Sequence, residues 1–334
     1  MARVLRDAVL DYFYRRLNMS RYRLWGTIAL APILAAALAM AGCGGGDKAA
    51  TESGGGARTA EGGGKRIPAK DRTPIEGKGT ATLKGRVTLA GGNPPPPRDL
   101  KPEMEKQGDK ARCLDPQAVK EGLTQSEEWI VGADKGVKNV VVFLKAPAGK
   151  YFKVPDNLRH RSGDKVQMEQ PYCAFQPHIL AINPTCWDAE AKKQEPTGQE
   201  FTIINNATML HNTAWKGDDR FNPGANEKLS PKQVLNVRAF PCKENEVGKE
   251  DILRITCDVH KWMYARVVVL DHPYYDVTKA DGSYEIKNAP AGAEVEVVRW
   301  HESMGDSTTT NKVPKETVTL NPGENTKNFT ISVP

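Results

Sequence analysis

The sequence predicts an all-β protein made of β-sandwich domains. From about residue 81 onward, short stretches that alternate or are rich in β-branched residues recur, and turn residues separate them. Few stretches show helical periodicity of useful length, although residues 188–193 are expected to form one or two helical turns. This part of the chain can form one large or two small sandwiches, and the strand spacing favours a sandwich over an α/β fold.

Residues 1–42 are predicted to be a signal peptide. Residues 1–23 carry six arginines against two aspartates, and an apolar run follows from residue 24 to residue 41. The run ends in small residues directly before Cys43, which is the order typical of an export signal. An uncleaved anchor is the alternative, because the run approaches the ~18–20 residues that span a membrane.

Residues 38–43 read LAMAGC and resemble the lipobox of bacterial lipoproteins, with Met40 where leucine is usual. The resemblance implies that Cys43 is lipidated and becomes the first residue of the mature chain. The protein would then be lipid-anchored in the cell envelope, facing the periplasm or the exterior. A diacylglycerol meets the need for more than one acyl chain, and export permits disulfides.

Residues 43–80 are predicted to be a disordered, Gly-rich tether, because this stretch contains hardly any large apolar residue. Most of the net charge of +6 lies in the predicted signal peptide: residues 1–42 contribute six minus two, or +4, which leaves +2 for residues 43–334. A nearly neutral body argues against a nucleic-acid partner, which would require a concentrated basic surface.

The predicted strands follow in order along the remaining chain. They lie at residues 82–89, 137–145, 201–204, 234–237, 252–256, 265–270, 283–286, 295–300, 317–320 and 328–333. Gly91, Gly92, Asn93 and four prolines end the first strand, and similar turn residues separate the others.

Residues 276–300 contain two turn signals, Asp281-Gly282 and Pro290-Ala291-Gly292. This pattern resembles the carboxypeptidase regulatory-like domain, a transthyretin-like β-sandwich. The resemblance implies that residues 81–150 and 272–334 form the two parts of one such sandwich, with a central segment between them. Domains of this kind imply scaffolding or carbohydrate-type binding rather than catalysis.

The central segment contains a C-x-x-H-x-x-M motif, in which Cys257, His260 and Met263 lie between two predicted strands. His211 lies upstream, at the end of a β-rich run. One thiolate, two imidazoles and a weak axial thioether are the ligands of a blue-copper site, and this set suits both copper valences. The alternatives are that Cys257 forms a disulfide and that Met263 fills the core.

The two motifs together resemble the cupredoxins, most closely the amicyanin- and plastocyanin-like blue copper proteins. The resemblance implies a cupredoxin-like Greek-key β-sandwich at residues 151–271, inserted in or packed against the second small β-sandwich. It also implies one type 1 copper site, whose ligands are His211, Cys257, His260 and Met263.

The resemblance also assigns roles around the copper. Asn212 would tie the two ligand loops together by hydrogen bonds. His260 would supply an exposed edge for electron transfer, with Lys261 and Trp262 beside it on the docking face. Lys261 and Trp262 replace the Pro-Phe type of loop, which leaves the reduction potential and the partner surface open.

Five cysteines remain after Cys43, and an odd number leaves at least one unpaired. Cys257 is the best candidate for the free thiolate. The other four can pair in three ways, of which Cys113–Cys173 with Cys186–Cys242 is favoured.

Cys173 and His178 form a second Cys/His cluster that could supply a metal ligand. The favoured interpretation is that Cys173 is paired and that His178 begins a strand after a proline. His160, His272 and His301 have no matching partners and are expected to lie on the surface or to be satisfied by the protein.

We therefore expect a membrane-tethered one-electron carrier with an unidentified redox partner protein. The alternatives are a non-redox binding or structural lipoprotein, and a protein that stores or delivers copper. An enzyme is not expected, because the chain has no H-x-H pairs of the kind that multicopper oxidases require.

Overall fold

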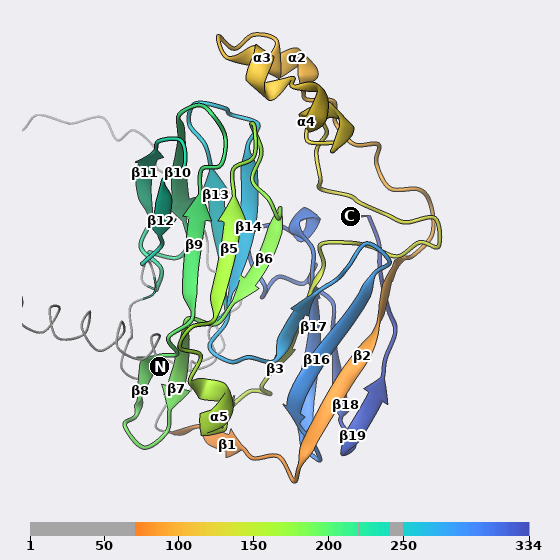
Figure 1. The fold of residues 1–334 in the computed structure, drawn as a ribbon. Helices are drawn as coiled ribbons and strands as arrows, with labels where there is room; N and C mark the ends of the chain where they lie inside the picture. The colour runs from red at the N-terminus through yellow and green to blue at the C-terminus, as the bar shows by residue number, and fades with distance from the viewer. Residues whose placement is uncertain (1–70, 220, 239, 241–249, 334) are drawn as a thin grey trace, which may run out of the picture. The chain divides into compact units, whose positions relative to one another are not determined.

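The computed structural model describes residues 71–219, 221–238, 240 and 250–333, and these residues form an all-β fold (Figure 1). The predicted signal peptide, Cys43 and most of the predicted tether lie outside the described residues. The fold class expected from the sequence is confirmed. Among the described helices, none is long and apolar enough to cross a membrane.

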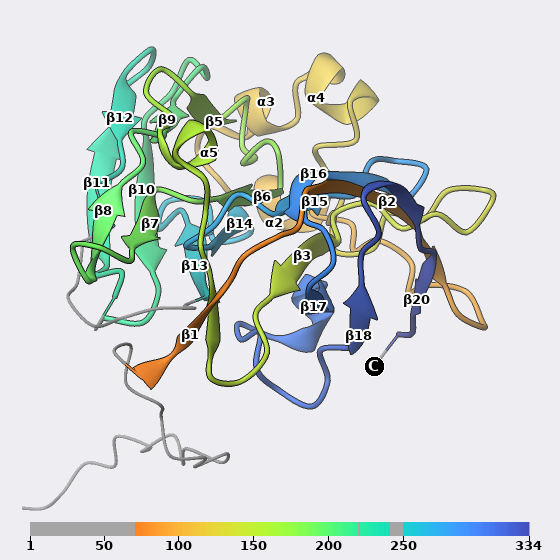
Figure 2. The same cartoon turned by 90° about the horizontal axis from the view of Figure 1, so that it is seen from below.

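The first sandwich is built from strands at both ends of the described chain. One of its sheets has the order β15-β3-β17-β18, with β15 (Tyr275–Val277), β3 (Val141–Lys145), β17 (Glu294–Trp300) and β18 (Lys315–Thr319). The other is centred on β2 (Thr80–Leu89), which pairs with β16 (Ser283–Pro290), β19 (Gly323–Thr326) and β20 (Phe329–Ile331) (Figure 2).

The second sandwich is inserted in sequence between β3 and β15. Its larger sheet has the order β11-β10-β13-β14-β6, with β11 (Ala225–Leu229), β10 (His211–Lys216), β13 (Asp251–Thr256), β14 (Tyr264–Val269) and β6 (Ile179–Ile182). Its smaller sheet has the order β12-β9-β5, with β12 (Val234–Asn236), β9 (Glu200–Ile204) and β5 (Lys165–Glu169).

Burial patterns explain why these stretches form strands. In β2, the buried residues Ala81, Leu83, Val87 and Leu89 are separated by more exposed ones, as expected for a strand with one face on a core. By contrast, Val141–Leu144 of β3 are all fully buried.

Residues of both sandwiches, including Phe143 and Val268, belong to one hydrophobic cluster. The two sandwiches therefore share apolar surface rather than being joined by the chain alone.

Three short helices between β2 and β3 were not expected from the sequence. They are α2 (Lys101–Met104), α3 (Lys110–Cys113) and α4 (Pro116–Lys120). Each has only four or five residues, which is too short to generate a recognisable helical period. Figure 1 shows them above the end of the inserted sandwich where the loop between β13 and β14 lies.

Two local expectations are wrong. Residues 188–193 do not form a helix, because they make the turn between the paired strands β7 (Thr185–Asp188) and β8 (Lys193–Pro196). The predicted tether does not extend to residue 80, since β1 (Thr73–Ile75) pairs with β4 (Lys150–Phe152) and buries Ile75. Helix α5 (Asp156–Arg159) and a 3-10 turn, η2 (Glu302–Met304), complete the elements.

Candidate metal site

The sheet register brings His211 beside the loop between β13 and β14. Strands β10 and β13 are antiparallel neighbours, with Ala214 opposite Thr256. His211, at the start of β10, therefore lies level with the residues that follow Thr256. Because β13 and β14 are also paired, the loop from Cys257 to Met263 is held at both ends.

Three side chains converge at this end of the sheet. The sulfur of Cys257 lies 3.9 Å from Nδ1 of His211 and 3.9 Å from Nδ1 of His260. The two Nδ1 atoms are 3.1 Å apart. Ligand atoms that bind one metal at about 2.0–2.3 Å lie roughly 3–4 Å from one another. The three distances between these side-chain atoms therefore fit a single coordination centre.

The other ring nitrogen of each histidine is already used. His211 donates from Nε2 to the carbonyl oxygen of Tyr172 at 2.6 Å. His260 has Nε2 3.0 Å from a carboxylate oxygen of Asp109. Both partners are acceptors, so in each neutral ring the hydrogen lies on Nε2 and the lone pair lies on Nδ1. Two buried lone pairs then face each other and a thiol, which is the arrangement that a cation requires.

Burial prepares His211 for this role. The pKa of His211 is lowered to about 4, mainly because the ring is desolvated and secondly because His260 lies beside it. A histidine with this pKa is neutral near pH 7, and neutral imidazole is the form that binds a metal. Cys257 is a buried free cysteine, 2% exposed.

Met263 closes the loop at the same site. Its backbone N–H donates to the carbonyl of His260 at 2.8 Å, and its own carbonyl accepts from the backbone of Cys257 at 3.2 Å. Its side chain is 2% exposed and belongs to the same core cluster as Cys257. The methionine is thus held within the loop that carries two of the three converging side chains.

Asn212 joins the two segments that carry these side chains. Its Oδ1 accepts from the backbone of Asp258 at 2.6 Å and from Sγ of Cys257 at 3.2 Å. Its Nδ2 donates to Asn226 at 2.7 Å and to the carboxylate of Asp258 at 3.1 Å. These bonds fix the start of β10 against the 257–263 loop.

The second Cys/His cluster does not join the site. Cys173 forms a disulfide with Cys113, which confirms the first favoured pairing. His178 directly precedes β6, with Nδ1 3.1 Å from the carbonyl of Tyr264 and Nε2 2.5 Å from the carboxylate of Glu302. Both ring nitrogens are therefore occupied by protein atoms.

The second favoured disulfide is not borne out. Cys186 is a buried free thiol in β7, and its expected partner Cys242 lies outside the described residues. Burial raises the pKa of Cys186 to about 12. The raised pKa keeps this thiol protonated near neutral pH.

The expected exposed face at His260 is also wrong. His260 is 0% exposed and Trp262 is 4% exposed, and only Lys261 of the three is exposed. The reason is the helical segment of residues 98–125, which we call the cap. Asp109 of the cap contacts His260, and the Cys113–Cys173 disulfide ties the cap to the inserted sandwich.

Asp109 is the residue that the sequence did not reveal. It is 151 positions from His260, and no motif links the two. One signal in the sequence was available. Cys113 lies four residues after Asp109, and the favoured disulfide pairing already placed Cys113 beside Cys173.

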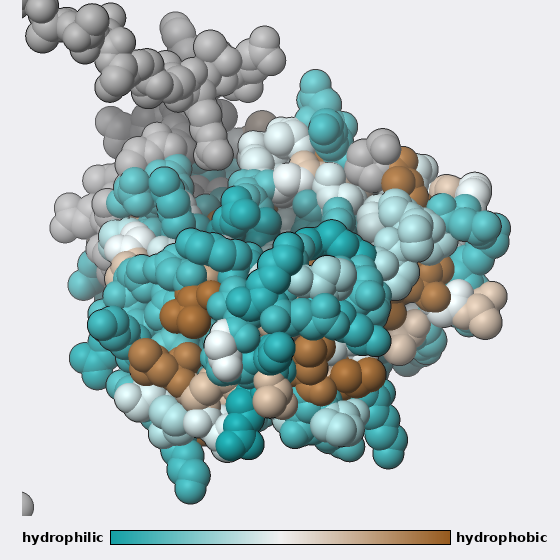
Figure 3. Space-filling view, turned by 90° about the horizontal axis from the view of Figure 1, so that it is seen from above, coloured by the Kyte–Doolittle hydropathy of each residue, from teal (hydrophilic) through white to brown (hydrophobic). Residues whose placement is uncertain are grey.

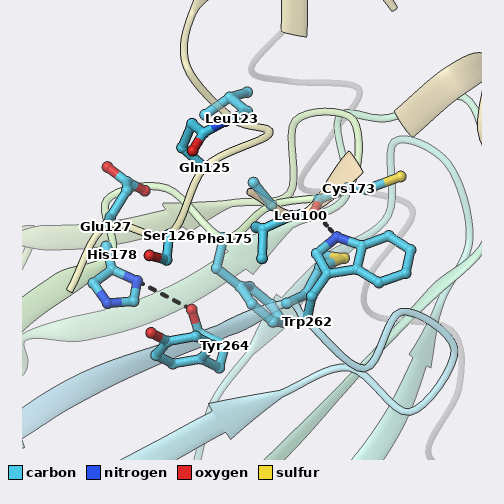
Figure 4. A pocket seen from close by; sticks show the side chains of 12 residues that line it. Leu100, Leu123, Gln125, Ser126, Glu127, Cys173, Phe175, His178, Trp262 and Tyr264 are labelled. Carbon is cyan, nitrogen blue, oxygen red and sulfur yellow. Dashed lines mark hydrogen bonds between the residues drawn. The ribbon is translucent and has the colours of Figure 1, made fainter. Parts of the chain in front are cut away.

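A cavity of about 30 Å³ lies between the cap and the inserted sandwich (Figure 4). Leu100 and Leu123 of the cap line it together with Trp262 and Met263. Trp262 donates from its indole nitrogen to the carbonyl of Cys173 at 3.1 Å, as the dashed line in Figure 4 marks. The cavity has room for one or two water molecules at most.

No family model and no curated protein sequence matches this chain. Among solved structures, 31% of the chain aligns with the Cu-containing nitrite reductase from Thermus scotoductus, at 13% identity and a TM-score of 0.22. That alignment spans 22% of the reductase, well under two thirds of its length.

Two smaller proteins are matched over most of their length. The purple cupredoxin from Nitrosopumilus maritimus aligns with 31% of this chain and 98% of its own, at 16% identity and a TM-score of 0.21. Amicyanin from Paracoccus versutus aligns with 35% of this chain and 89% of its own, at 17% identity and a TM-score of 0.22. Scores this low carry no argument, so the site is interpreted from its own residues.

Proposed function

We propose that this chain is a type 1 copper protein that carries single electrons outside the cytoplasm. His211, Cys257, His260 and Met263 would hold the metal. The observation that carries the proposal is the pair of imidazoles whose Nδ1 atoms face the free thiol of Cys257 while their Nε2 atoms are bound elsewhere. No ordinary hydrogen-bond network explains two opposed lone pairs in a buried place.

The donor set favours copper over other metals. Structural zinc sites usually have four strong ligands, whereas two imidazoles, one thiolate and a thioether suit a metal that alternates between two valences. Bound copper would supply the Cu(II)/Cu(I) couple. The strands and Asn212 hold the ligands in place, which keeps rearrangement small when an electron arrives or leaves.

Electron exchange requires an approach other than His260 itself. Leu210 is 46% exposed and directly precedes His211, and Val259 is 44% exposed and directly precedes His260. With the exposed Lys261, they offer an apolar contact with a positive charge beside it. Seen from the end on which the cap lies, the surface is mainly hydrophilic with separate hydrophobic spots (Figure 3). We propose that the redox partner docks over Leu210, Val259 and Lys261.

The cellular setting is proposed from the sequence. The basic n-region, the apolar run and Cys43 support a lipid-anchored protein of the cell envelope. The turn pattern of residues 276–300 supports a resemblance of the first sandwich to the carboxypeptidase regulatory-like domain, and hence a role as a scaffold or a binding domain. Cys43→Ser should release the chain from membranes or leave it unprocessed, and membrane fractionation with the mature mass checks this.

Copper storage or delivery is the second candidate, because His260 is 0% exposed and offers no exposed edge for electron transfer. A carrier exchanges electrons quickly and keeps its metal, whereas a delivery protein transfers copper to an acceptor. Stopped-flow oxidation by an inorganic complex, compared with loss of Cu(I) to a chelator, separates the two.

The test of the proposal is a metal analysis and a visible spectrum of the chain produced in an oxidising compartment. One equivalent of copper with an intense thiolate-to-copper charge-transfer band is expected. A chain that takes up zinc in preference to copper, or binds copper without that band, contradicts the proposal.

A further inference from the structure

The two imidazoles of the site differ in what holds their outer nitrogens. His211 donates from Nε2 to a neutral carbonyl, that of Tyr172, at 2.6 Å. His260 has Nε2 3.0 Å from Oδ2 of Asp109. One ring is thus bonded to a neutral acceptor and the other to a carboxylate, although both present Nδ1 to the same thiol.

We propose that Asp109 is a positioning residue of the metal site, which orients His260 and lowers the reduction potential of the bound copper. This inference rests on the proposed function. A carboxylate partner fixes the tautomer of a ligating histidine and makes the ring a stronger donor. A stronger donor and an added negative charge stabilise Cu(II) relative to Cu(I).

The helix to which Asp109 belongs shows that its carboxylate is not needed locally. Asp109 occupies the N-cap position of α3 but makes no capping hydrogen bond. Asp115 occupies the same position in α4, and its side chain accepts from the backbone of Gln117 at 2.9 Å. An N-cap aspartate usually accepts a hydrogen bond from a backbone N–H of its own helix. The carboxylate of Asp109 instead contacts Nε2 of His260.

The cap is fixed so that Asp109 stays in place. Cys113 lies one helical turn after Asp109, and the backbone N–H of Cys113 donates to the carbonyl of Asp109 at 3.4 Å. The disulfide joins Cys113 to Cys173, and both sulfurs lie within 4.8 Å of a ring nitrogen of His260. The covalent link therefore sits directly beside the contact that it maintains.

Apolar packing fixes the other end of the cap. Leu100 and Met104 are 5% and 0% exposed, and they belong to the same core cluster as Cys257 and Met263. The backbone of Leu100 donates to the carbonyl of Thr124 at 2.9 Å, which closes the base of the cap. Asp109 is thus held from both sides, while its carboxylate remains 32% exposed.

The experiment compares the copper-loaded full chain with Asp109→Asn. Asparagine keeps the shape and can still accept a hydrogen bond from Nε2 of His260, but it carries no charge. We expect copper to be retained, the reduction potential to rise and the charge-transfer band to shift. Asp109→Glu, which restores a carboxylate, should return the potential toward that of the wild type.

Asp115→Asn is the matched control, because it changes the same residue type at the N-cap of the next helix in the cap. It should leave both α4 and the potential essentially unchanged, because asparagine caps a helix about as well as aspartate does. If Asp109→Asn folds poorly, the double variant Cys113→Ser with Cys173→Ser frees the cap from its covalent link, and it should raise the potential in the same direction.

A blue wild type whose potential is the same in Asp109→Asn overturns this inference and leaves the proposed function intact. An equal shift in Asp115→Asn overturns it as well, because the effect would then belong to the cap in general. A wild type that binds no copper overturns the proposed function and this inference together.

Discussion

The described chain buries histidines in two different settings. At the candidate metal site, His211 and His260 each use Nε2 for a protein acceptor and leave Nδ1 facing a free thiol. Elsewhere, His178 engages both ring nitrogens, with Tyr264 and Glu302. His272 packs between Phe152 and Tyr274 and accepts from the backbone of Tyr274.

The difference shows that burial alone does not identify a metal ligand. All four of these rings are buried, and a Cys and a His are close in sequence in both Cys/His clusters. What separates them is the second partner of each ring, since a histidine with one nitrogen engaged and the other facing a thiol is poised to bind a metal. The predictions below test this distinction.

The largest effect is expected from Cys257→Ser, which removes the only soft anionic donor of the site. The charge-transfer band should vanish and copper should bind much more weakly, as measured by visible spectroscopy and metal analysis. Cys186→Ser is the matched control, because it changes the other buried free thiol of the described residues and should leave the band unchanged. Mass spectrometry that finds Cys257 in a disulfide would contradict the assignment.

Met263→Leu should have a moderate effect. An axial thioether is a long, weak ligand, so copper should be retained and the reduction potential should rise, because a less donating axial position favours Cu(I). Voltammetry measures the shift. Met168→Leu, at a fully buried methionine of the same core cluster, should leave the potential unchanged. An equal rise in both variants would assign the effect to packing.

The buried histidines outside the site should make the protein sensitive to acid. Burial lowers the pKa of His272 to about 3 and that of His301 to about 4. The unfolded chain therefore takes up protons below about pH 6.5 that the folded chain does not. Each of these histidines should cost about 1.4 kcal/mol of stability per pH unit as the pH falls from 6.5 toward 4.

His272→Gln tests this, because glutamine cannot take up the proton. The free energy of unfolding of the metal-free protein should fall less steeply between pH 6.5 and 4 than in the wild type. His160→Gln, at an exposed histidine, serves as the control and should leave the slope unchanged. An unchanged slope in His272→Gln would show that this ring is not held neutral by the fold.

The smallest effect on copper is expected from His178→Ala. The spectrum should be unchanged, because both nitrogens of His178 already have protein partners, although stability should fall since Glu302 loses its partner. His211→Ala is the comparison, and it should keep some copper with an altered spectrum. If His178→Ala bleaches the protein while His211→Ala does not, the metal belongs to the Cys173–His178 cluster instead.

The sequence by itself determined the all-β class and the residues that converge at the site. Alternation in residues 82–89 and β-branched runs such as 252–256 are local signals, because the period of a strand is two residues. The C-x-x-H-x-x-M spacing is also local: one short loop carries Cys257, His260 and Met263. His211 lies far from this loop in sequence, and the pairing of β10 with β13 brings it to the site.

The tertiary structure alone decided what surrounds that site. The cap covers His260 through helices of four or five residues, which are too short to leave a periodic pattern. Asp109 contacts His260 across 151 positions of sequence. Cys186 is buried because its strand packs into the shared core. Contacts between distant residues depend on how whole elements pack, so the burial of the candidate metal site and its carboxylate partner follow from the fold rather than from any motif.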